Sequence, residues 1–265
     1  MILLKSEEQI SRMKVAGYSL SCWMTCVIAD IINGKITTGI KAKEHFEDFF
    51  SKKRLSPSLV KNIGFPFIDA YNSKNEKFGH PICVSINDGV VHCAPNKRIF
   101  QPGDVITLDA GLSWKGLHAD MARTIIYPGK RNDKASEMLT LIEKCSDGIS
   151  QMLKPGLPVK EISNYIHSFE EYTHIVYAYG GHGIGMSMHE EPYIPNHPGQ
   201  VQGNPILRAG MAICPEPMFV AGSNRLMLGS NGWDVYTEDG LIAVHMEDTY
   251  IIESNEIIKT TGELI

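Results

Sequence analysis

The order of helix-like and strand-like segments constrains the fold of this 265-residue chain most, because the same order occurs twice. An amphipathic helix is predicted over residues 6–33, where Ser6 and Gln9 form a capping-box pattern. A second helix is predicted over 41–53. Several strand-like runs follow, and the order is then repeated by helices predicted over 131–153 and 159–172 and by further strand-like runs. The strand-like runs of both halves lie at 81–86, 103–109, 121–127, 173–180, 211–217 and 243–253.

This repeat predicts the α+β class, with helices segregated from mostly antiparallel strands that share one core. No linker or low-complexity tract separates the two occurrences. We therefore expect a single domain over residues 1–265, made of two similar halves of about 1–130 and 131–265.

Composition excludes several classes of function. The net charge of −5 gives no general electrostatic reason to bind DNA. The N-terminal apolar run is too short for a signal peptide, and we expect no membrane-spanning segment. Six cysteines without a CxxC pair are typical of reduced thiols, so a cytoplasmic protein is expected.

Two aspartates in the segment 103–126 carry the first chemical signal. If this segment is a hairpin that turns near Trp114 and Lys115, Asp109 and Asp120 lie opposite one another on one face. A bulge at Gly116 would shift the pairing by one residue. Two carboxylates about 5 Å apart among apolar residues repel each other unless a cation lies between them. The alternative is that both aspartates are solvated turn residues.

Further candidate ligands lie in the second half of the chain. Glu216 and Glu247 occur in apolar, strand-like runs, where a single glutamate is usually an outward-facing residue. The glycine-rich stretch 180–192 carries His182 and His189, and its glycines are not followed by the Lys or Ser/Thr of a phosphate loop.

Together, two Asp, two Glu and His182 form an oxygen-rich donor set with one imidazole. Such a set suits Mn, Fe(II), Co or Zn in a catalytic site better than a structural zinc site. Four carboxylates exceed the need of one catalytic zinc, so two divalent metal ions bridged by shared carboxylates are expected.

These motifs resemble those of the methionine aminopeptidases, in the short bacterial (type I) form of the M24 peptidase family. The resemblance rests on GHGIG with MHEEP, LDAGLSWKGLHAD, CPEPM and MEDT, and it runs from Ile2 to about Glu253. It implies the pita-bread (creatinase/aminopeptidase) fold, a pseudo-two-fold arrangement with a mixed, mostly antiparallel sheet covered by helices.

The resemblance also implies a role for each candidate residue. Asp109 would chelate one ion, Asp120 and Glu247 would bridge both ions, and His182 and Glu216 would complete the other ion's shell. Glu216 would also act as the general base.

Other residues match the family's substrate-contacting positions. His92 would lie beside the scissile amide nitrogen, and His189 would donate to the carbonyl oxygen. Cys83 and Trp233 match residues that line the methionine pocket, although core packing explains either residue equally well. Met188 is also assigned to this pocket.

The chain departs from the family pattern in four places. Met188 stands where the family usually has Phe, Asp248 replaces the His of a Glu-His-Thr motif, and Cys93 replaces a Gly. The segment 62–81 is longer than usual, so the pocket residues that it supplies cannot be assigned.

The sequence therefore predicts a cytoplasmic, monomeric metalloaminopeptidase. It would remove the initiator methionine from peptides and nascent chains with a small second residue, without DNA or a membrane as partner; the ribosome is left open as a partner. The alternatives are a pita-bread peptidase of other specificity, such as X-Pro cleavage, and a non-catalytic binding protein of the same fold.

Overall fold

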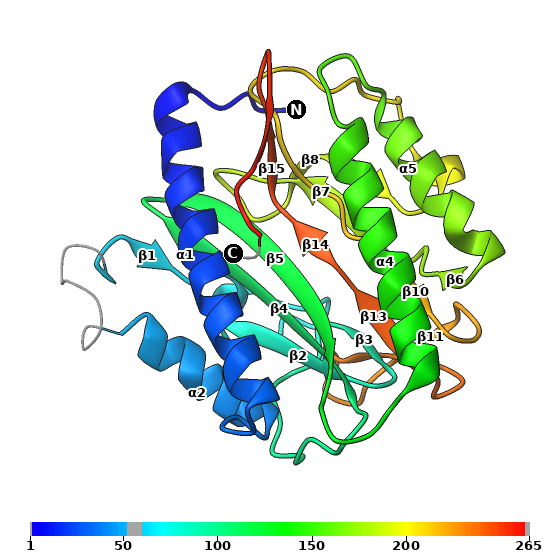
Figure 1. Ribbon diagram of the computed structural model, residues 1–265. Helices are drawn as coiled ribbons and strands as arrows, with labels where there is room; N and C mark the ends of the chain where they lie inside the picture. The colour runs from blue at the N-terminus through cyan, green and yellow to red at the C-terminus, as the bar shows by residue number, and fades with distance from the viewer. Residues whose placement is uncertain (1, 52–59, 263–265) are drawn as a thin grey trace.

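Four α-helices cover antiparallel strands in the computed structural model, which describes residues 2–51 and 60–262 (Figure 1). The helices are α1 (Glu7–Ile32), α2 (Gly39–Phe49), α4 (Asp133–Met152) and α5 (Val159–His167), with 3-10 turns at Pro66–Asp69, Ser168–Glu171 and Pro198–Gln200. Helix α1 packs on β4 (Val105–Trp114) and β5 (Leu117–Ile126), and α4 packs on strands of the second half and also on β5. Strand β5 thus contacts helices from both halves of the chain.

The predicted helices are present, with shifted ends. Ser6 and Gln9 form the expected capping box at the start of α1. Helix α2 begins two residues before the predicted start because the Thr38 side chain accepts a hydrogen bond from the Lys41 N–H. The predicted end of this helix at 52–53 lies outside the described residues.

Every strand pair in the described ranges is antiparallel, in four sheets. One sheet contains β1 (Ile63–Gly64), β4, β5, β14 (Glu247–Asp248) and β2 (Ile82–Ile86), and another contains β16 (Ile257–Lys259), β15 (Tyr250–Ile252), β9 (Ala212–Cys214), β7 (Gly180–Gly183) and β8 (Glu190–Pro195). Two three-stranded sheets consist of β13 (Ala243–His245), β10 (Met218–Val220) and β6 (His174–Ile175), and of β11 (Leu226–Leu228), β12 (Val235–Thr237) and β3 (Gly89–Val91). The α+β class with mostly antiparallel strands is confirmed.

The run 243–253, predicted as one strand, is three short strands. β13 pairs with β10, β14 pairs with β5, and β15 pairs with β9 and β16. The chain therefore passes through three sheets within ten residues, from 243 to 252, and Glu247 lies in the middle of this passage. Alternation of residue types cannot reveal such a division, because it predicts faces and not partners.

Helix α1 bears on the expectation that the chain has no membrane-spanning segment. Contrary to the sequence analysis, this helix is long and apolar enough to cross a membrane by length and composition. Its apolar face is buried against the sheet, with Leu20, Trp23 and Val27 in one core cluster with residues of β4 and β5. Such burial is that of a core helix. The organisation into one catalytic domain with two similar halves stays a prediction.

Candidate metal centre

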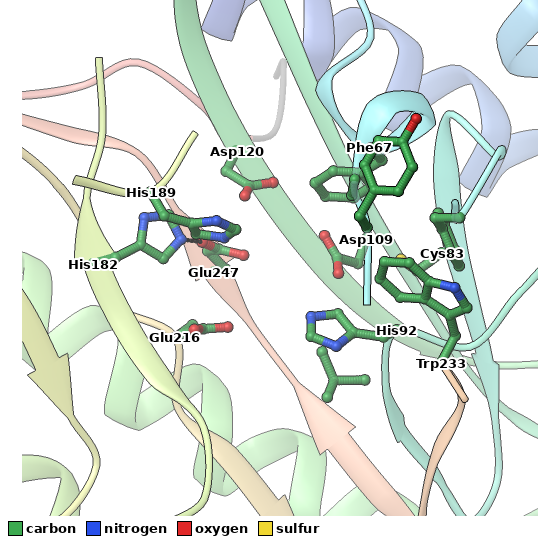
Figure 2. Close-up of a pocket in the computed structure, with 14 residues that line it drawn as sticks. Phe67, Cys83, His92, Asp109, Asp120, His182, His189, Glu216, Trp233 and Glu247 are labelled. Atoms are coloured by element: carbon green, nitrogen blue, oxygen red, sulfur yellow. Dashed lines mark ion pairs between the residues drawn. The ribbon is translucent and has the colours of Figure 1, made fainter. Parts of the chain in front are cut away.

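All of the candidate residues except Met188 line a cavity of about 410 Å³ (Figure 2). Most of the carboxylates and imidazoles gather on one side of the cavity and the labelled aromatic side chains and Cys83 lie on the other, with Asp109 and His92 between them. The lining residues are Phe67, Ala70, Tyr71, Phe78, Cys83, Val91, His92, Asp109, Asp120, His182, His189, Glu216, Trp233 and Glu247.

The β4–β5 hairpin places Asp109 and Asp120 on one face, but the predicted pairing was wrong. Lys115 and Gly116 form the two-residue turn, with φ of 50° and 77°, the positive values that a type I′ turn requires. Asp109 therefore pairs with Ala122, and Asp120 pairs with Gly111. The two aspartates are diagonal neighbours, which leaves more room between them than a direct pair would.

Glu216 and Glu247 approach from the second half of the chain. Met218 pairs with His245, and Glu216 lies two residues before Met218 while Glu247 lies two residues after His245. The two glutamates therefore face the same side. Glu247 also pairs with Ala122 on β5, which lies two residues after Asp120 and on the same face. Strand pairing thus brings all four carboxylates to one end of the cavity.

Burial makes these carboxylates unfavourable as free anions. Burial and the charge of Glu216 raise the pKa of Asp109 to about 8. Burial also raises the pKa of Asp120, Glu216 and Glu247 well above the usual range, with neighbouring carboxylates adding to the effect. A cation among them would reverse this penalty.

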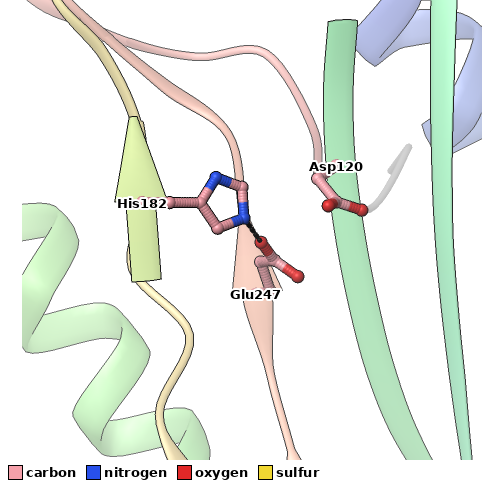
Figure 3. Close-up of side chains that lie close together, drawn as sticks. All are labelled: Asp120, His182 and Glu247. Atoms are coloured by element: carbon pink, nitrogen blue, oxygen red, sulfur yellow. Dashed lines mark ion pairs between the residues drawn. The ribbon is translucent and has the colours of Figure 1, made fainter. Parts of the chain in front are cut away.

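His182 has the tautomer that a metal ligand needs. Its Nδ1 lies 2.9 Å from the carbonyl oxygen of Gly183, which leaves the Nε2 lone pair free. Nε2 lies 3.7 Å from Glu247 Oε1, and donor atoms of Asp120, His182 and Glu247 lie within 4.8 Å of one another (Figure 3). Burial, and then His189, lowers the pKa of His182 to about 3, so the ring is neutral.

Two further histidines face the same cavity. The ring of His189 lies 4.5 Å from that of His182, between centroids. His92 has a φ of 58°, an uncommon conformation for a non-glycine residue, and its ring packs edge-on against Tyr179. Burial lowers the pKa of His92 to about 4 and also lowers that of His189.

His245 was left without a role by sequence reasoning, yet it lies at this centre. Donor atoms of Glu216, His245 and Glu247 form a second group within 4.8 Å of one another. The residue is 1% exposed, and burial lowers its pKa to about 3. Its position two residues before Glu247 on an alternating strand was the available signal.

Asp248 lies behind the carboxylates in a buried ion pair. Its Oδ1 lies 2.7 Å from Arg123 Nη2, and its Oδ2 lies 2.8 Å from Lys259 Nζ. Arg123 Nη1 also donates to the carbonyl oxygen of Glu247 at 2.8 Å. Arg123 therefore joins Asp248 to the backbone that carries a candidate ligand.

The apolar side of the cavity is built largely by the long segment 62–81. Phe67, Ala70, Tyr71 and Phe78 from this segment line the cavity, and the rings of Phe78 and Trp233 lie 5.0 Å apart. Cys83 and Trp233 also line it. Their contact with a methionine side chain stays a prediction. The segment has no periodicity that could have identified these residues.

Met188 is not among the residues that line the cavity. It packs against a core cluster that includes Ile10, Met13 and Ile184, and its Cε lies where a side chain at residue 111 would begin. Its role in substrate binding stays a prediction.

The side chains fit divalent metal ions. Asp109 Oδ1 and Glu247 Oε1 are buried and have no hydrogen-bond partner within the described parts of the chain. Buried carboxylate oxygens without a partner are unfavourable unless a cation accepts their charge. Carboxylates with one imidazole are the donors that Mn, Fe(II), Co and Zn accept.

Comparison with known proteins gives the family. The pattern of Metallopeptidase family M24 matches residues 31–254. The chain belongs to this family. It is 32% identical to the methionine aminopeptidase of Mycoplasma capricolum, over 98% of this chain and 99% of that one. It is 37% identical to the methionine aminopeptidase of Aquifex aeolicus, over 95% of each.

Solved structures share the fold. A methionine aminopeptidase from Thermotoga maritima superposes with a TM-score of 0.86 at 29% identity, covering 99% of this chain and all of that one. The prolidase of Pyrococcus horikoshii gives a TM-score of 0.71 at 19% identity, and only 65% of that chain is covered. The pita-bread fold expected from the sequence is confirmed.

Proposed function

We propose that this M24 chain is a methionine aminopeptidase, which removes the N-terminal methionine of nascent proteins with divalent metal ions. The observation that carries this function is the cavity itself, because it joins a cluster of buried carboxylates to an apolar wall. An unbranched apolar side chain such as that of methionine fits such a wall, while its scissile bond lies beside the carboxylates. The full-length relatives named methionine aminopeptidases support the same function.

A second cleft gives the rest of the substrate a path away from the centre. It is lined by His92, His182, His189 and Glu216, which also line the first cavity, and its other side includes Tyr193. A peptide with its first side chain in the apolar cavity can therefore extend along this cleft. A preference for a small second residue belongs to the same proposal.

We assign five residues to two divalent ions: Asp109, Asp120, His182, Glu216 and Glu247. Bound ions would lower the pKa of a water molecule so that it becomes a nucleophile near neutral pH. Manganese, cobalt, iron(II) and zinc all suit this donor set.

The chain's own residues would manage the protons and the oxyanion. Glu216, whose pKa is raised by burial, can take a proton from the attacking water and pass it to the leaving amine. His189 donates to the developing oxyanion, and His92 contacts the scissile amide nitrogen. Monomeric state, a cytoplasmic location and contact with the ribosome belong to the same proposal.

The function is tested by the release of methionine from Met-Ala-Ser with each metal. We expect metal-dependent release by the wild type and a fall in kcat of about 10² or more in Glu216→Gln. Gly-Pro and other X-Pro dipeptides serve as the specificity control. Faster cleavage of X-Pro dipeptides would contradict the methionine assignment, and full activity of verified apoprotein would contradict the metal assignment.

A further inference from the structure

His245 lies between two of the candidate ligands, but no hydrogen bond of its ring explains why a histidine is buried there. Its Nε2 lies 3.4 Å from Glu216 Oε2 and 3.9 Å from Glu247 Oε2. Neither ring nitrogen has a hydrogen-bond partner within the described parts of the chain, although the side chain is 1% exposed. A fully buried imidazole without partners is costly, so a role at this centre is expected.

Two roles are possible for an imidazole in this place, and they require opposite tautomers. A metal ligand needs a free lone pair on the nitrogen that faces the ion, as His182 has because its Nδ1 faces the carbonyl of Gly183. His245 has no such acceptor beside its Nδ1. The acceptors near its ring are the carboxylates, and both are near Nε2. With the carboxylates ionised, as a bound cation would keep them, the neutral ring is therefore more stable with its proton on Nε2.

A proton on Nε2 turns His245 into a hydrogen-bond donor toward Glu216. The present separation of 3.4 Å exceeds the usual range of about 2.7–3.2 Å by little, and the Glu216 side chain is 13% exposed and can rotate toward the ring. Hydrogen bonds at such centres tighten when the site is loaded. One oxygen of Glu216 would then be held by His245, and the other would face the cavity.

We propose that His245 is a positioning residue that donates from Nε2 to Glu216 Oε2 and so fixes the orientation of that carboxylate. The inference rests on the role proposed for Glu216. Groups that hold a ligating carboxylate typically contribute a factor of about 10–100 in metal affinity or activity.

The test compares His245→Leu, which removes the donor, with His245→Gln, which retains an N–H donor. We expect His245→Leu to weaken Mn²⁺ binding about 10–100-fold by isothermal titration calorimetry and to lower kcat with little change in KM. His245→Gln should remain within about 3-fold of the wild type, since a neutral donor still reaches Glu216. Met246→Leu, which changes the neighbouring residue packed in the helix-covered core, is the matched control and should change neither quantity.

The tautomer of the His245 ring can be measured in the wild type, without a variant. In zinc-loaded wild type labelled with ¹⁵N-histidine, long-range ¹H–¹⁵N spectra should show the proton of His245 on Nε2. A proton on Nδ1 would overturn the proposal in favour of a sixth metal ligand. Equal losses in the Leu and Gln variants, or no loss in either, would also overturn it.

The metal titration separates this inference from the proposed function. If none of the proteins releases methionine but the order of Mn²⁺ affinity is as expected, the function is wrong and the positioning role stands. If methionine is released and the affinity of His245→Leu equals that of the wild type, the positioning role alone is wrong.

Discussion

Replacing Asp248 by alanine should destabilise the protein far more than replacing its exposed partner. The Asp248 carboxylate is completely buried and lies between Arg123, which is 7% exposed at the side chain, and Lys259, which is 37% exposed. Thr261 Oγ1 donates to Asp248 Oδ1 at 2.8 Å. The Asp248→Ala change removes the hydrogen-bond acceptor of Arg123 and Thr261 and the ion-pair partner of Lys259, and it leaves the guanidinium group buried without a counterion.

The expected loss in the free energy of unfolding depends on which ion-pair partner of Asp248 is exposed to water. Removing one member of a buried ion pair costs about 3–5 kcal/mol. Arg123 keeps the carbonyl oxygens of Ala122 and Glu247 as acceptors, so we expect the lower end, about 3 kcal/mol. At about 2–4 °C per kcal/mol, Tm should fall by about 6–12 °C. Lys259→Met loses only a partly exposed ion pair, worth about 0–1 kcal/mol.

Differential scanning calorimetry in the presence of a chelator measures this difference without a contribution from bound metal. Asp248→Ala and Lys259→Met are the matched pair, and the Arg123→Met/Asp248→Leu double variant should recover much of the loss because it leaves no buried charge. Equal Tm values for Asp248→Ala and Lys259→Met would refute the reasoning, since they would mean that Arg123 does not depend on Asp248.

Three further predictions concern the bound metal, the oxyanion donor and a buried ion pair. Removal of metal should abolish methionine release, and Mn²⁺ at about 100 times its Kd should add about 2.7 kcal/mol to the free energy of unfolding, measured by calorimetry. His189→Ala should lower kcat about 10²–10³-fold with metal content unchanged, and a normal kcat would exclude His189 as the oxyanion donor. Lys5→Met should destabilise the fold at neutral pH because Lys5 Nζ lies 2.6 Å from Glu190 Oε2 in a buried ion pair. Burial opposes the charge of Glu190, but hydrogen bonds from Lys5 and the Ser187 N–H lower its pKa on balance. This stabilisation is present above the usual glutamate pKa of about 4.3 and is lost as the pH falls below it, so urea titrations of wild type and Lys5→Met should converge in acid.

The helices and the hairpin could be predicted because their signals are local. The apolar period of α1 and the alternation in β4 and β5 follow from residues that are close in sequence. The pairing of Asp109 and Asp120 was predicted wrongly because Lys115 adopts a positive φ. A lysine side chain does not favour this conformation, and nothing in the sequence indicates it.

The remaining parts of the site depend on contacts between distant segments. Nothing local indicates that 243–253 divides among three sheets, because the partners of each short strand lie elsewhere in the chain. The segment 62–81 forms its part of the cavity wall without regular periodicity. His245 was left unassigned because a single strand histidine is usually a core residue, although its position two residues before Glu247 was a signal. The structure places it between Glu216 and Glu247.

The passage of residues 243–252 through three sheets determines when the centre can form during synthesis. Glu247 is translated after the other four proposed ligands. Its segment is held against β5 by a hydrogen bond in which Thr249 Oγ1 accepts from the Asp120 N–H, across a separation of 129 residues. Contacts of such long range form late in folding, because the intervening chain must first be ordered. A chain still being translated therefore holds Asp109 and Asp120 on a finished hairpin but has no complete set of ligands. The enzyme should stay inactive until almost all of its own sequence has left the ribosome.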